Sequence, residues 1–255
     1  MATSSSPRGR QNYATALQFG PTHVKMPKGR HQATIVWLHG LGDSGSIWAE
    51  ILGSFPVHNV KWICPTAPTR PVPIFARLPG RAWFDPRDVS EEDTSPDSQG
   101  LNETAALIAQ IFSREPCDVK LGIGGFSIGA AAALYAATHY ILGEDGSRLQ
   151  FLENLSSVIV LSGWLPFYKS LRRKMDGSSL SNVLHVKQLH VFLGHGTEDE
   201  VVSFEHGEKS ACILHSAGFQ NLTWTRFEGL CHDTCGAEML EMCSWLNEAL
   251  KLQGW

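Results

Sequence analysis

The chain has 255 residues, of which 43% are hydrophobic and 18% charged, enough apolar material for a sizeable core. This composition excludes a collagen, a coiled coil and a largely disordered chain. The formal net charge of −4 argues against nucleic acid as a partner, because nucleic-acid binders carry a basic excess. No apolar stretch in the sequence is long enough to span a membrane.

The N-terminal residues 1–14 are rich in Ser and Arg and lack the apolar segment of a secretory signal. We therefore expect a disordered tail there, followed by a single domain over residues 15–255. The six cysteines are scattered, several of them within apolar runs, which is typical of free thiols in a reducing compartment. These features predict a cytoplasmic protein, with a nuclear pool as an alternative, and leave the oligomeric state open.

Short apolar runs rich in β-branched residues alternate along the chain with longer segments of helical periodicity. The predicted strands are Ala33–Leu38, Val60–Cys64, Val119–Gly124, Ser157–Leu161, Leu189–Leu193 and Leu222–Phe227. The predicted helices run from a cap at Ser98 to Phe112 and over Ile128–Ile141, Phe204–Ser216 and Ala237–Leu252. This alternation predicts an α/β fold with a mostly parallel central sheet and helices on both faces.

The segment 70–98 interrupts this alternation with five prolines and several large apolar side chains. A long loop of this kind is usually functional or disordered, and its apolar content favours packing over disorder. We expect it to cover a binding site, although it could instead seal an edge of the sheet. The candidate substrate-binding residues are Ile74, Phe75, Leu78, Trp83 and Phe84, together with Trp164.

The strongest chemical signal is the sequence Gly125-Phe126-Ser127-Ile128-Gly129, between a predicted strand and a predicted helix. A sharp strand–turn–helix of this kind exposes a serine at the carboxyl edge of the sheet, and its tight geometry requires the two glycines. We predict that Ser127 is a nucleophile. The simpler alternative is a serine that only caps the helix.

A serine nucleophile requires a base that is itself oriented by an acid, and in this architecture the acid precedes the histidine in the chain. The loop after the predicted strand Leu189–Leu193 offers Glu198, Asp199 and Glu200 as acids. His232 follows the next strand and is the predicted base. His195 is a rival base, but it lies on the strand that supplies the acid, and a structural role fits it better.

A tetrahedral intermediate also requires hydrogen-bond donors for its oxyanion. The strand Ala33–Leu38 runs into the loop His39-Gly40-Leu41-Gly42-Asp43, as in the early loop that supplies one donor in α/β-hydrolases. The candidates are the backbone N–H groups of Leu41 and Ile128.

Taken together, these motifs resemble the acyl-protein thioesterase/carboxylesterase family of α/β-hydrolases, which is also described as lysophospholipase-like. The matching stretches are residues 38–43, 65–72, 83–85 and 125–129, His195-Gly196 with Asp199 and Val202, and Gly229 with His232. The resemblance implies Asp199 as the acid and hydrolysis of acyl thioesters or esters, with acylated proteins or small acyl esters as substrates. The chain also resembles a plant branch of this family, which includes short-acyl esterases and protein deacetylases.

Several other patterns in the sequence favour a different chemistry less strongly. The sequence Gly40-Leu41-Gly42-Asp43-Ser44-Gly45 matches a dinucleotide motif, but no acid follows at the expected place. Cys231, His232 and Cys235 lack the paired spacing of a zinc site, so we expect neither a metal nor a cofactor. The basic run 171–174 predicts at most a transient contact with a membrane surface. A ligand-binding protein of the same fold without catalysis remains a remote alternative.

Overall fold

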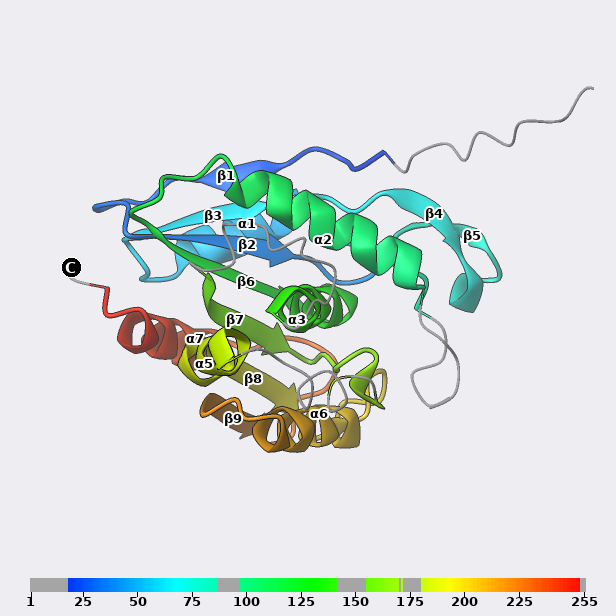
Figure 1. Cartoon of the computed structure of the whole chain (residues 1–255). Helices are drawn as coiled ribbons and strands as arrows, with labels where there is room; N and C mark the ends of the chain where they lie inside the picture. Colours follow the sequence, from blue (N-terminus) through cyan, green and yellow to red (C-terminus); the bar gives the residue numbers. More distant parts are fainter. Residues whose placement is uncertain (1–17, 87–96, 142–154, 170, 172–179, 253–255) are drawn as a thin grey trace, which may run out of the picture.

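The computed structural model describes residues 18–86, 97–141, 155–169, 171 and 180–252 (Figure 1). The predicted tail at 1–14, the part of the predicted cover at 87–96 and residues 172–174 of the basic run lie outside the described residues. Within the described residues, no helix is long and apolar enough to cross a membrane.

A central sheet of seven strands has the order β1-β3-β2-β6-β7-β8-β9. Its strands are β1 (His23–Lys25), β2 (Ala33–Leu38), β3 (Val60–Cys64), β6 (Lys120–Phe126), β7 (Leu155–Leu161), β8 (His190–Gly196) and β9 (Asn221–Phe227). All neighbouring pairs are parallel except β1 with β3, at one edge. The predicted class, a mostly parallel sheet with helices, is therefore confirmed, and the six predicted strands lie within two or three residues of the observed ones.

The helices are α1 (Gly45–Ser54), α2 (Ser98–Phe112), α3 (Ile128–Ile141), α5 (Leu180–Gln188), α6 (Phe204–Ser216) and α7 (Gly236–Ala249). They cover both faces of the sheet because side chains of each buried strand alternate between the faces. Val36 and Leu38 of β2 belong to a core cluster with α2, α3 and α6. Ile35 and Trp37 belong to a second cluster with α1 and α7.

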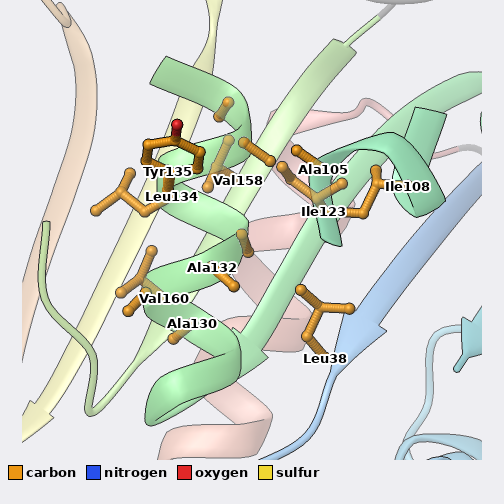
Figure 2. Packing of buried hydrophobic residues seen from close by; sticks show 14 of the residues in the cluster. Leu38, Ala105, Ile108, Ile123, Ala130, Ala132, Leu134, Tyr135, Val158 and Val160 are labelled. Carbon is orange, nitrogen blue, oxygen red and sulfur yellow. The ribbon is translucent and has the colours of Figure 1, made fainter. Parts of the chain in front are cut away.

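Helix α3 carries the residue that follows Ser127 and packs closely on the middle of the sheet (Figure 2). Its first turns contain the four alanines Ala130 to Ala133, which are all buried. Their small side chains allow the helix axis to approach β6 and β7. Leu134 and Tyr135 continue this buried face toward Val158 of β7. The tight packing of α3 fixes the position at which the preceding turn stands above the sheet.

The segment expected to be an irregular cover contains a β-hairpin instead. β4 (Thr69–Val72) pairs with β5 (Leu78–Arg81), and the short 3₁₀ helix η1 (Pro73–Phe75) begins the turn between them. Three prolines concealed this hairpin in the sequence, because proline is disfavoured within sheets. Among the described residues the hairpin forms a separate sheet of two strands, so Pro71, paired with Pro79, interrupts no larger ladder there.

Candidate active site

Ser127 lies in the sharp turn between β6 and α3, and its backbone φ of 56° is in the left-handed region. The turn is held by the N–H of Ser127, which donates to the carbonyl of Leu161 at 2.9 Å. A Cβ atom at Gly125 or at Gly129 would lie only 2.5 Å or 2.2 Å from the carbonyl oxygen of Leu38. The two glycines are therefore required by close backbone packing, and the strained conformation of Ser127 is imposed from both sides.

The structure brings Ser127, Asp199 and His232 together at the carboxyl ends of the strands. His232 Nε2 lies 2.9 Å from Ser127 Oγ, and His232 Nδ1 lies 2.7 Å from Asp199 Oδ2. Because an ionised carboxylate can only accept, the proton on the imidazole belongs on Nδ1, and Nε2 is free to accept from the serine hydroxyl. The neighbouring acids Glu198 and Glu200 are exposed, and only Asp199 of the three contacts His232.

Asp199 is buried, and each of its oxygens accepts two polar contacts. Oδ1 accepts from the backbone N–H groups of Val201 and Val202 at 2.9 Å and 2.8 Å. Oδ2 accepts from His232 and also lies 3.3 Å from Nε2 of His195. Burial by itself raises the pKa of Asp199, but hydrogen bonds from His195, His232 and Val202 outweigh it and hold the pKa below its usual range. The carboxylate is thus charged where it meets His232.

His195 does not contact Ser127. Its Nε2 donates to the carbonyl of Val202 at 2.8 Å, and its ring packs edge-on against Phe204. Its Nε2 lies 3.3 Å from Asp199 Oδ2, the same oxygen that accepts from His232. Both histidines thus contact the acid, and of the two His232 is the one that also contacts the serine.

The loop after β2 is held by hydrogen bonds from two directions. His39 is buried, and desolvation lowers its pKa, so the ring is neutral: Nε2 accepts from the N–H of Ala67 at 3.0 Å and Nδ1 donates to the carbonyl of Gly40 at 2.6 Å. The second set comes from Arg81 of the hairpin. Its backbone carbonyl accepts from the N–H of Gly42 at 2.9 Å, and its guanidinium donates to the carbonyl of Asp43 at 3.1 Å.

The backbone N–H groups near Ser127 differ in whether they are already hydrogen-bonded within the protein. The N–H groups of Gly42 and Ser127 are bonded to Arg81 and Leu161. In the described part of the chain no protein acceptor takes the N–H groups of Leu41 and Ile128. Ile128 is also the first residue of α3, where N–H groups lack intrahelical partners and the helix dipole favours negative charge.

The candidate substrate-binding residues are divided into two sets by the structure. Ile74, Phe75 and Leu78 are 54%, 46% and 65% exposed at the turn of the hairpin. Trp83 and Phe84 are only 1% and 2% exposed. Trp83 has a specific partner in the core, because its indole N–H donates to the carbonyl of His39 at 2.8 Å. A role of these residues in substrate binding stays a prediction.

Trp164 lies in the loop after β7 and is partly buried. Its ring contacts Phe84 edge-on, with the ring centroids 6.0 Å apart. The sequence analysis did not identify Arg81, and no local pattern could have done so, because its contacts to Gly42 and Asp43 join segments far apart in the chain.

Within the described residues, no group of three or more His, Cys, Asp and Glu side chains could hold a metal ion. All six cysteines are free thiols. Cys64 and Cys243 are buried, whereas Cys117, Cys212 and Cys231 are exposed.

Residues 20–250 match the phospholipase/carboxylesterase family of α/β-hydrolases. The chain belongs to this family. The chain is 34% identical to an acyl-protein thioesterase 1 of Cryptococcus neoformans, over 90% of this chain and 98% of that protein. The resemblance carried by the sequence motifs is thereby confirmed.

Two solved plant structures are similar over most of the chain. The crystal structure of Zea mays acyl-protein thioesterase 2 has 45% sequence identity and a TM-score of 0.85, covering 91% of this chain and 99% of that chain. Arabidopsis thaliana SOBER1 has 28% identity and a TM-score of 0.67, covering 86% of this chain and 99% of that chain. Both similarities extend well beyond the motifs to most of the chain.

Proposed function

We propose that this protein is a serine hydrolase that cleaves acyl thioesters or esters through an acyl-enzyme on Ser127. The observation that carries the proposal is the continuous hydrogen-bonded chain from Ser127 through His232 to Asp199. A serine hydroxyl is a weak nucleophile by itself and becomes reactive when an oriented base accepts its proton. Membership of the phospholipase/carboxylesterase family supports the same chemistry.

In the first half of the reaction, Ser127 Oγ attacks the acyl carbonyl while His232 Nε2 takes the hydroxyl proton. The resulting imidazolium is stabilised by the charged Asp199, which also keeps the Nδ1 proton in place. The negative charge that forms on the carbonyl oxygen is met by the N–H groups of Leu41 and Ile128. When the intermediate collapses, the thiol or alcohol leaves with the proton from Nε2, and the acyl group remains on Ser127.

In the second half, a water molecule gives its proton to His232 Nε2 and attacks the acyl-enzyme. The same two N–H groups receive the second oxyanion, and the return of the proton to Ser127 Oγ releases the carboxylic acid. Each half thus uses one base, one acid and one pair of backbone donors, and no cofactor is required.

The proposed substrates are acylated proteins or small acyl esters, because the relatives described above include acyl-protein thioesterases. The exposed side chains Ile74, Phe75 and Leu78 favour a long acyl chain, which would cover apolar surface that is otherwise in water. The hairpin that carries them lies toward the carboxyl ends of the parallel strands (Figure 1). Short-acyl esters, lysophospholipids and acetylated proteins are the alternative substrates.

The decisive experiment measures turnover of p-nitrophenyl esters of increasing chain length by the wild type, Ser127→Ala and Ser162→Ala. Ser162 is a matched control, because it also directly follows a central strand, has a positive φ of 48° and is buried. We expect Ser127→Ala to lose at least about a thousandfold in kcat and to escape labelling by a fluorophosphonate. Turnover by Ser127→Ala at the level of the wild type would overturn the proposal, and the best chain length identifies the acyl class.

A further inference from the structure

A row of aromatic rings leads from the core on the α1 side of the sheet to His232. Trp37 of β2 packs on Trp48 of α1 with ring centroids 5.1 Å apart, and Trp48 packs on Phe126 at 5.8 Å. Phe126 in turn packs on the imidazole of His232 at 5.0 Å with an interplanar angle of 40°. The row joins β2, α1 and β6 to the loop before α7, and its last ring is the proposed base.

The row is anchored by a charged side chain of the loop after β2. Asp43 Oδ2 accepts from the indole N–H of Trp48 at 2.8 Å, and Asp43 Oδ1 accepts from the N–H of Ser44 at 2.7 Å. With its nitrogen bonded in this way, the Trp48 ring has one orientation to present to Phe126. The loop that supplies the proposed oxyanion donor Leu41 therefore also orients the aromatic support of the base.

Phe126 contacts this loop directly as well. A Cβ atom at Gly40 would lie 3.0 Å from Cδ1 of the Phe126 ring, so the ring occupies the space beside Gly40. The backbone of Phe126 immediately precedes Ser127. One side chain thus touches the base and the oxyanion loop, and its main chain adjoins the nucleophile.

The imidazole of His232 has its two nitrogens held by Ser127 and Asp199, but these contacts leave the ring faces unsupported. The side chain is 15% exposed, and the adjacent Asp233 carboxylate accepts from the N–H of Thr234 rather than from His232. An aromatic ring beside the imidazole limits its rotation. The electron-rich face of such a ring also attracts the imidazolium that forms in each half of the reaction.

We propose that Phe126, oriented by Trp48 and Asp43, is a positioning residue that holds His232 in line with Ser127 and stabilises its protonated form. This inference rests on the proposed function. It predicts an effect on the chemical step and on the pH dependence, because the support acts on the base and not on the acyl group.

The test compares Phe126→Leu with Phe126→Tyr in purified full-length protein, using a p-nitrophenyl ester across the pH range. For Phe126→Leu we expect a fall in kcat of about threefold to thirtyfold, a KM within about twofold of the wild type, and an acidic limb of the kcat/KM profile displaced to lower pH. Phe126→Tyr retains the ring and is expected to restore both the rate and the profile. A folded Phe126→Leu with the kcat and pH profile of the wild type would overturn the inference.

A second pair of variants tests the anchor and guards against a Phe126 variant that does not fold. Trp48→Phe keeps an aromatic ring but loses the N–H bond to Asp43 together with part of the indole volume. Trp245→Phe is the matched control, because its indole N–H bonds to Thr223 at 3.1 Å on the same side of the sheet, far from the loop after β2. We expect kcat to fall in Trp48→Phe alone, and equal rates in the two variants would contradict the proposed anchoring.

These outcomes are distinguishable from a failure of the proposed function. If Ser127→Ala is as active as the wild type, the hydrolase proposal itself is wrong and the inference falls with it. If Ser127→Ala is inactive while Phe126→Leu and Trp48→Phe are normal, the hydrolase stands and only the positioning role is refuted.

Discussion

Glu238 lies in the first turn of α7 with its carboxyl group fully buried against the sheet. Its Oε1 is close enough to β8 that a Cβ at Gly194 would lie 2.8 Å away, and neither carboxyl oxygen has a hydrogen-bond partner among the described residues. Burial raises its pKa from 4.5 to about 8, with further contributions from Asp233 and Glu241. A helix N-terminus usually favours a carboxylate, and here desolvation outweighs that preference.

This raised pKa makes the stability of the fold depend on pH. The unfolded chain loses the Glu238 proton near pH 4.5, whereas the folded protein keeps it until about pH 8. The contribution is therefore fully present below pH 4.5 and is lost as the pH rises to about 8, at about 1.4 kcal/mol per pH unit. The free energy of unfolding should fall by about 3 kcal/mol between pH 4.5 and 7 from this group, and by about 5 kcal/mol at pH 8 and above.

Glu238→Met fills a similar volume without a titratable group. We expect the variant to be more stable than the wild type, by about 3 kcal/mol at pH 7, with a difference that increases toward pH 8. Urea unfolding followed by circular dichroism at pH 5, 6, 7 and 8 measures both the size and the slope. Glu248→Met is the control on the same helix, because Glu248 is exposed and does not contribute to the raised pKa of Glu238. A pH slope unchanged in Glu238→Met would refute the reasoning.

Three further predictions concern other sites. Asp97→Ala removes the N-cap acceptor of α2 and should lower the free energy of unfolding by about 1–3 kcal/mol, measured with urea. His195→Phe deprives Asp199 of a donor and should lower kcat about tenfold to a hundredfold; an unchanged kcat would show that the backbone donors suffice. Burial raises the pKa of Cys64 and of Cys243 to about 12, so iodoacetamide should modify neither until the protein unfolds, as mass spectrometry can report.

The sequence predicted the elements whose own residues determine them. β2, β3, α3 and α6 have the predicted ends, since each is a clear apolar run or a clear helical period. α1 was missed because its ten residues contain two glycines and follow a glycine-rich loop. The hairpin β4–β5 was missed because prolines at 71 and 79 contradict strand propensity, and only the pairing of the two strands reveals it.

Some residues of the candidate site could likewise be predicted from the sequence, and others could not. Ser127 and His232 could be proposed from chain order and local turns, although they are 105 residues apart, because parallel strands end at one edge of the sheet. The choice among three neighbouring acids needed the family resemblance, and in the structure Asp199 is the one that contacts His232. The contact of Phe126 with His232 and the burial of Trp83 depend on packing between distant segments, which no periodicity contains.

The attachment of the hairpin gives it a fixed base and a free tip. Arg81, at the base, is joined through its carbonyl and its guanidinium to Gly42 and Asp43, whereas residues 74, 75 and 78 at the tip are largely in water. If the tip binds the acyl chain as proposed, an exchange of the tip alone is expected to alter the preferred acyl group and to leave the bonds at the base in place. Substitutions at the exposed tip therefore change the apolar surface of the hairpin and leave in place the hydrogen bonds that hold the loop after β2.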